Sequence, residues 1–312
     1  MNPVRSKKST MSANSLKADR ISNGMKIITH NGSFQADDIF AVAILMLVVG
    51  EAEIVRTRDK DQIATADYVV DVGMICDPDK GRFDHHQSEG AGVRSNGIPY
   101  ASCGLVWKKY GERLAGGKEE ADLIDINLMQ PLDAHDNGVA IADYRFKGVR
   151  AYDIVDFFYS FRVNLHESEE ELYQIFMRLV SMARDLLIRE ISRTKLVIES
   201  EAKVRQAFEM SEDKRMVILS EQLPWRRVLS KEPEAKFVIH PRNDGRWGVR
   251  AVVENAYTPR LSLPAAWGGK TGKELQEITG VREAVFCHRG LFLVLAENKE
   301  GAIKLAKLAL DA

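Results

Sequence analysis

Short apolar runs that alternate with an apolar helical segment constrain the fold of this chain most strongly. Lys26–Thr29, Ile54–Arg56 and Tyr68–Val72 have the length and residue types of strands. Residues Ala36–Val49 form an apolar, glycine-free segment with the length of a helix. The run at Tyr68–Val72 is apolar enough for burial on both faces of a sheet. This alternation is typical of βαβ units and predicts a parallel sheet.

The later part of the chain changes character twice. From Val149 to Leu223 there is neither glycine nor proline, which favours helices. An apolar stripe at helical spacing predicts a core face there, formed by Leu172, Ile175, Phe176, Leu179, Ala183, Leu186, Leu187 and Ile191. The last hundred or so residues favour a smaller α/β domain. Its expected strands are Phe237–His240, Trp247–Val252 and Leu291–Leu295, and its closing helix is Asn298–Leu310.

Length and composition set the domain plan and the class of protein. A chain of 312 residues can form two domains, which we place at residues 24–205 and 206–312, joined by helices. Residues 1–23 are polar and basic and are expected to form a disordered tail. A net charge of -1 argues against a generally basic nucleic-acid coat, and no apolar run is long enough to span a membrane.

Three widely spaced cysteines, Cys76, Cys103 and Cys287, predict a reducing compartment rather than a disulfide framework. We therefore expect a cytoplasmic protein, with organellar targeting by the basic tail as the alternative. A homodimer is compatible with the sequence.

Four clusters of histidine and aspartate precede residue 137. They are His30 with Asp37 and Asp38, Asp71 alone, Asp84-His85-His86, and Asp133-Ala134-His135-Asp136. His30 lies just past one predicted strand and Asp71 lies at the end of another, and ligands of parallel sheets bind at the carboxyl ends of strands. Each cluster alone is weak evidence, because such residues are common in turns, helix caps and solvated loops. Together they predict a metal site.

The donor set restricts the metal. Imidazole mixed with carboxylates suits Mn²⁺, Fe²⁺, Co²⁺ or Zn²⁺, and Mg²⁺ less well. Two such ions about 3.5–4 Å apart can share one carboxylate. We expect two Mn²⁺ ions, with Mg²⁺, Co²⁺ or Zn²⁺ as alternatives.

The motifs of the chain resemble those of a known family. Asp84-His85-His86 resembles the motif of the DHH phosphoesterase superfamily, and the closer resemblance is to the MYG-one family of metal-dependent hydrolases. It covers nearly all of the chain after residue 24. The motifs that carry it, in order, are His30-Asn31-Gly32-Ser33-Phe34, Asp37-Asp38, residues 53–59, Val70-Asp71-Val72-Gly73, Phe83-Asp84-His85-His86-Gln87, Asp133-Ala134-His135-Asp136-Asn137-Gly138, Pro224-Trp225 and residues 247–252.

The resemblance implies a DHH-like catalytic domain and a 3′–5′ exonuclease acting on RNA or short oligonucleotides. His30 and Asp37 would then bind one metal, and Asp71 would bridge to the second. His85 and either Asp133 or Asp136 would bind that second metal. His86 would face the substrate phosphate, and Asp84 would orient the imidazoles.

One departure from the family pattern concerns Gln35, where the family usually has a histidine. An amide is a poorer ligand than imidazole, so we expect a weaker first metal site. His135 is a weak candidate to compensate for it.

Cations that bind an anionic substrate are predicted in both domains. Arg56 and Arg58 follow the second strand, and Arg250 interrupts an apolar strand, where an arginine is costly unless paired. His288 and Arg289 resemble in placement the substrate-binding turn of DHH nucleases.

Two alternatives to the nuclease remain open. One is a hydrolase of a small phosphate ester or anhydride, such as pyrophosphate or a nucleotide. The other is a metal-binding protein without turnover. Gln35 supports this alternative, because it stands where the family usually has a histidine.

Overall fold

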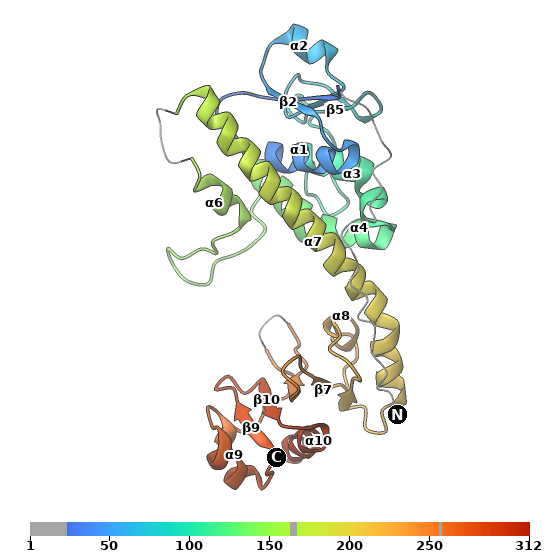
Figure 1. The fold of residues 1–312 in the computed structure, drawn as a ribbon, viewed down its shortest axis with the longest axis vertical. Coiled ribbons are helices and arrows are strands. Elements are labelled where there is room, and N and C mark those ends of the chain that lie inside the picture. Colours follow the sequence, from blue (N-terminus) through green and yellow to red (C-terminus); the bar gives the residue numbers. More distant parts are fainter. Residues whose placement is uncertain (1–23, 163–166, 256–257) are drawn as a thin grey trace, which may run out of the picture. The chain divides into compact units, whose positions relative to one another are not determined.

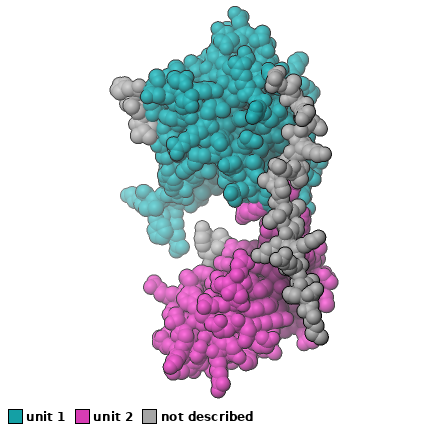
Figure 2. Space-filling model, viewed as in Figure 1, with its two compact units in different colours: residues 1–192 teal, residues 193–312 magenta. Residues whose placement is uncertain are grey.

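The computed structural model describes residues 24–162, 167–255 and 258–312. The chain forms two compact units that divide between Ser192 and Arg193 (Figure 2). This division and the sequence-based one after residue 205 both fall inside one helix, α7 (Glu169–Met210). The basic tail predicted for residues 1–23 lies outside the described residues. Within those ranges, no helix has the length and apolarity needed to cross a membrane.

A five-stranded sheet organises the first unit (Figure 1). Its order is β2-β1-β3-β5-β4, and all neighbours are parallel except β4 and β5. The strands are β1 (Lys26–Thr29), β2 (Glu53–Arg56), β3 (Tyr68–Val70), β4 (Cys76–Asp77) and β5 (Arg82–Phe83). The predicted parallel sheet is confirmed, although β3 ends two residues earlier than the apolar run and β4 and β5 were not predicted.

Alternating side chains of the strands pack into two different clusters. Ile27 of β1 faces helices α1 (Ala36–Val49) and α3 (Ser102–Ala115), whereas Ile28 faces the short helix α2 (Lys60–Thr65). Both isoleucines are fully buried, so the sheet is covered on both faces as its continuous apolar strands require.

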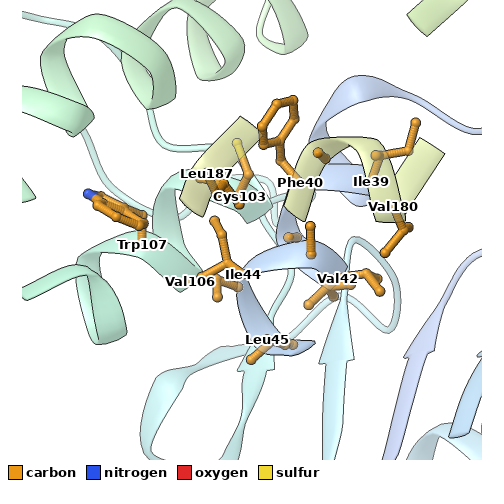
Figure 3. Packing of buried hydrophobic residues seen from close by; sticks show 14 of the residues in the cluster. Ile39, Phe40, Val42, Ile44, Leu45, Cys103, Val106, Trp107, Val180 and Leu187 are labelled. Carbon is orange, nitrogen blue, oxygen red and sulfur yellow. The ribbon is translucent and has the colours of Figure 1, made fainter. Parts of the chain in front are cut away.

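The larger cluster forms where α1, α3 and α7 meet (Figure 3). Phe176, Leu179, Ala183 and Leu187 of α7 are fully buried there, which confirms the core face predicted from helical spacing. The other helices of the first unit are α4 (Lys118–Ile124), a π-helical turn (Asp125–Met129), α5 (Gln130–Asp136) and α6 (Ile154–Tyr159).

The second unit is a smaller α/β unit, as predicted. Its five-stranded sheet has the order β6-β7-β8-β10-β9, and only β6 and β7 are parallel. The strands are β6 (Met216–Ile218), β7 (Phe237–Pro241), β8 (Trp247–Ala251), β9 (Ala284–Cys287) and β10 (Leu293–Ala296). Helices α9 (Gly272–Thr279) and α10 (Lys299–Leu310) cover one face, and α8 (Arg226–Leu229) with the end of α7 covers the other.

Candidate metal centre

Three neighbouring parallel strands of the first unit end in metal-binding side chains. His30 follows β1, Asp71 follows β3, and the segment from Asp84 to His86 follows β5. Because carboxyl ends of parallel strands meet at one edge of a sheet, these side chains converge. The loop after β1 also leads into α1, which brings Asp37 and Asp38 to the same edge.

Asp71 lies at the centre of this arrangement. Its two carboxylate oxygens lie 3.3 Å from Nε2 of His30 and 3.3 Å from Nε2 of His85, one oxygen for each ring. Its backbone adopts a left-handed conformation with φ of 55°, which a residue without a special role seldom keeps. Burial opposes its ionisation, but hydrogen bonds with His30 and His85 lower the pKa of Asp71 below its ordinary range.

Nε2 of His30 faces two carboxylates. Its Nδ1 lies 3.1 Å from the main-chain oxygen of Asn31, and because a carbonyl only accepts, Nδ1 carries the proton. In the neutral ring, Nε2 is then free to bind a metal. This nitrogen lies 3.4 Å from Oδ2 of Asp38. Asp38, rather than the expected Asp37, is therefore the carboxylate beside His30.

Asp38 belongs to the first sequence cluster but was not predicted to be a metal ligand. It is fully buried, and its Oδ1 accepts a 2.8 Å hydrogen bond from the main-chain N–H of Gln35. Its Oδ2 is buried without a hydrogen-bond partner among the described residues. Burial raises the pKa of Asp38 to about 7. A cation beside Oδ2 would remove this cost.

A second group forms around His85. Its Nε2 lies 3.1 Å from Oδ2 of Asp136, and ligand atoms of Asp37, His85 and Asp136 all lie within 4.8 Å of one another. Asp37 is fixed by the main-chain N–H groups of Ser102 and Cys103, at 3.1 and 2.7 Å. Burial and the charges of Asp71 and Asp136 raise the pKa of Asp37 well above its ordinary range.

A protonated His85 offsets the negative charge of this second group. Burial lowers the pKa of His85, but hydrogen bonds with Asp136 and Asp71 outweigh burial and raise it to about 11. Yet Nε2 of His85 is buried without a hydrogen bond of good geometry. A buried ring nitrogen facing several carboxylate oxygens is the donor set of a divalent transition metal, so the residues fit a bound cation.

The two aspartates of α5 have different partners, and this difference decides between them as candidate ligands. Asp133 is fully buried and forms a 2.6 Å ion pair with Arg94, which also pairs with Asp125. Asp136 instead faces His85. Because Asp133 is already paired with Arg94, Asp136 is the stronger candidate for a metal ligand.

His86 differs from the other histidines because about half of its side chain is exposed. Asp84 is buried and holds it, with Oδ1 2.7 Å from Nδ1 of the ring and 3.1 Å from the main-chain nitrogen. The other oxygen of Asp84 accepts a 2.5 Å hydrogen bond from the N–H of Met74, a left-handed residue. The hydrogen bond with Asp84 raises the pKa of His86, which favours the protonated ring.

A pocket of about 520 Å³ opens at this edge of the sheet. His30, Asp71 and His86 lie in its wall. The wall also contains Arg58 and Arg162, two cations that can meet an anion. Gln35 lines the same pocket, at the place where the sequence predicts a weakened ligand.

Arg56 does not line the pocket, unlike Arg58. Its guanidinium group packs over the rings of Phe34 and Phe176 and donates a 2.8 Å hydrogen bond to the main-chain oxygen of Gly32. Arg56 thus supports the loop that carries His30 instead of reaching into the pocket.

The remaining candidates are one residue of the first unit and three of the second. His135 is exposed, with its ring 5.7 Å from that of Tyr159, and joins none of the potential ligand groups formed by the described residues. Arg250, His288 and Arg289 belong to the second unit. His288 stacks near Phe292 and accepts a hydrogen bond from the N–H of Gly290, and Arg289 is exposed.

Comparison with known proteins places the whole chain beside one family. The family model MYG1_exonuc, described as "Uncharacterised protein family (UPF0160)", matches residues 26–310. The MYG1 exonuclease of Mus musculus is 29% identical over 324 residues, which cover 91% of this chain and 84% of that protein. A MYG1 protein of Chlamydia pneumoniae is 31% identical over 294 residues, covering 91% and 96%. A MYG1 protein of Schizosaccharomyces pombe is 29% identical over 324 residues, covering 93% and 99%.

Proposed function

The chain belongs to the MYG1 family of exonuclease-type hydrolases, and we propose that it removes nucleotides from the 3′ end of RNA or short oligonucleotides in a metal-dependent reaction. The observation that carries this proposal is the position of Asp71. Its two oxygens face imidazoles from two different strand ends, at the wall of a pocket that Arg58 and Arg162 also line.

We propose two ligand groups that share Asp71. His30, Asp38 and Asp71 would hold one ion, and Asp37, Asp71, His85 and Asp136 would hold the other. The mixed nitrogen and oxygen donors favour Mn²⁺. When bound, such ions activate water and stabilise negative charge on a phosphoryl group. Gln35 supplies no imidazole to the first group, which makes that group the weaker of the two.

Residues of the chain would bind and orient the substrate. Arg58 and Arg162 line the pocket and can each pair with phosphate oxygens, a contact that guanidinium geometry favours. Asp84 holds Nδ1 of His86, so Nε2 of the protonated ring is the atom that can donate a hydrogen bond or a proton to the phosphate or to the leaving oxygen.

The size of the pocket favours a second candidate function. A volume of about 520 Å³ is enough for one nucleotide or a pyrophosphate, so hydrolysis of a small phosphate ester or anhydride would use the same residues. A longer RNA would have to place its terminal nucleotide there and continue outside the pocket.

A substrate panel tests the proposal. The purified chain is loaded with Mn²⁺ and offered 5′-labelled RNA, DNA of the same sequence, a dinucleotide and pyrophosphate, beside the variant Asp71→Asn. Stepwise shortening of RNA from the 3′ end by the unaltered chain alone supports the nuclease. Cleavage of pyrophosphate alone supports the second function, and no turnover with any divalent metal contradicts both.

A further inference from the structure

A second pocket lies wholly within the second unit and takes no part in the metal centre. Its volume is about 570 Å³. Its lining includes the cations Arg226 and Arg250 and the imidazole of His240. Leu223 and Trp225 contribute apolar surface to the same pocket. A pocket lined by both cations and apolar side chains suits a ligand that carries an anionic group and a ring.

The register of two strands explains how the cationic side forms. Antiparallel β7 and β8 pair Val238 with Arg250 and His240 with Gly248, so these four residues share one face of the sheet. At Val238 this face is covered by Val228 and Leu229 of α8. Gly248 adds no side chain opposite His240, and a Cβ placed there would lie 3.6 Å from Nε2 of that ring. The uncovered part of the face therefore becomes the pocket.

The arginines of this pocket differ in their partners. Arg227 pairs with Glu201, and Arg242, near the pocket, pairs with Asp244 at 3.4 Å. The guanidinium groups of Arg226 and Arg250, by contrast, form no ion pair or hydrogen bond with the residues that the structure describes. Their guanidinium carbons each lie 5.8 Å from a ring centroid, that of Trp225 for Arg226 and that of Phe292 for Arg250.

The electrostatic consequence is an unbalanced positive charge. Burial, and then the charges of Arg226 and Arg242, lower the pKa of Arg250. Burial, and then Arg250 and Arg242, likewise lower the pKa of His240, although its hydrogen bond to Pro241 opposes this. The half-buried guanidinium of Arg250, with like charges near it and no acid paired with it among the described residues, is costly unless an anion joins it.

We propose that this pocket binds the phosphate group of a nucleotide. Arg250 and Arg226 would bind the phosphate, and the side chains of Leu223 and Trp225 would contact the rest of the nucleotide. The phosphate could belong to the backbone of a nucleic acid or to a free nucleotide. The choice of a nucleotide rests on the proposed function, whereas the anion site itself rests on the second unit alone. The site is thus a binding site for substrate or product separate from the residues that would cleave it.

Binding without turnover tests the site. The full-length chain carrying Asp71→Asn is kept in a chelator, and its affinity for a fluorescein-labelled oligoadenylate is measured by fluorescence anisotropy. Arg250→Gln and Arg226→Gln are compared with Arg282→Gln, which removes the same charge from an exposed position outside the pocket. We expect each pocket variant to bind about tenfold more weakly than the control. The slope of log K against log salt should fall by about 0.7, as expected for one lost phosphate contact on a single strand.

The source of the phosphate is separated by competition. Adenosine monophosphate that displaces the oligonucleotide from the Arg282→Gln control supports a free nucleotide as ligand, and displacement only by unlabelled oligonucleotide supports the backbone. The proposal is overturned if both pocket variants bind as tightly as the control. Since Arg226 is exposed, its replacement should leave the fold intact, so a misfolded Arg250→Gln chain would not obscure the result.

This design keeps the two proposals apart. Binding is measured without metal and without cleavage, so a chain that proves inactive on every substrate can still show the pocket effect. Conversely, an active nuclease whose pocket variants bind like the control would lose the phosphate site and keep the proposed function.

Discussion

Nε2 of His85 lies 3.1 Å from Oδ2 of Asp136, although the two residues come from the loop after β5 and from the end of α5. Asp133, one helical turn earlier, has its own cation in Arg94. On this contrast we propose that Asp136 binds the metal and that Asp133 contributes to stability.

Replacing Asp136 with Asn should weaken metal binding without unfolding the chain. The amide keeps the size of the side chain but loses the charge that a divalent cation needs, and we expect Mn²⁺ affinity to fall by about 100-fold. Titration calorimetry on chelator-treated protein measures it. Asp143→Asn, at an exposed position of the same unit, is the control. Equal affinities for the two variants would show that Asp136 does not bind the metal.

Replacing Arg94 with Met should instead destabilise the first unit. It leaves Asp133 buried without its cation, and loss of one partner of such a pair costs about 3–5 kcal/mol. Urea unfolding at pH 7.5 checks the loss, and Mn²⁺ affinity should change little. A variant as stable as the unaltered chain would contradict the role given to this ion pair.

The cost of the Arg94→Met change should also depend on pH. Burial raises the pKa of Asp133 to about 6 even beside Arg94, and without the cation the pKa rises further. The folded state then binds a proton that the unfolded state, with an ordinary pKa near 3.8, releases. Stability is therefore lost as pH rises from about 4 through the raised pKa, and the difference between the two chains should be smaller at pH 5 than at pH 7.5. A difference that does not change with pH would argue against a buried Asp133 carboxylate.

Much of the fold could be predicted from the sequence, because apolar patterns and turn residues indicate where many helices and strands begin and end. The bounds of β1 and α1 agree with the apolar pattern, and the end of β1 is marked by a turn sequence. The two-residue strands β4 and β5 could not be predicted, since two residues are too few to show a period of two. Their pairing joins residues that are separated in the sequence, as in the hydrogen bond from the N–H of Asp71 to the main-chain oxygen of Phe83, and is a tertiary effect.

The sequence predicts which residues lie in the candidate metal site better than it predicts how they are grouped. Consecutive residues at a helix start point about 100° apart, so Asp37 and Asp38 must face different neighbours. No local pattern says that Asp38 turns toward His30 and Asp37 toward His85. In the same way, Arg94 pairs with Asp133 although the two residues are far apart in the sequence. The spacing of residues within α5 does not predict this pairing.

Replacing Asp84 with Asn should lower turnover through His86 and leave Mn²⁺ content unchanged. Asp84 holds Nδ1 of His86 at 2.7 Å, and loss of a correctly held proton donor costs about 100-fold in rate. The raised pKa of His86 should return toward its ordinary value, so the basic limb of the pH–rate profile should move to lower pH. A slower variant with an unmoved profile would indicate a merely structural role for Asp84.

In the second unit, His240 should make stability depend on pH. Burial lowers its pKa below the ordinary value of 6.5, so the unfolded chain takes up a proton more readily than the folded one. The contribution of the neutral ring is fully present above pH 6.5 and is lost as pH falls below it. Tryptophan fluorescence during urea unfolding reports mainly this unit, which contains Trp225, Trp247 and Trp267. The fall in stability between pH 7 and pH 5 should be smaller in His240→Asn, and parallel pH curves would contradict this account.

The shared carboxylate of Asp71 is the central element of the proposed reaction, and metal stoichiometry tests it most directly. Chelator-treated protein is dialysed against excess Mn²⁺, and the metal bound per chain is measured by mass spectrometry for the unaltered chain and for Asp71→Asn. We predict two ions per chain, the one beside His30 bound more weakly, and fewer than one in the variant, because both groups lose the same carboxylate. No bound Mn²⁺ in the unaltered chain, or equal amounts in the two proteins, would contradict the account.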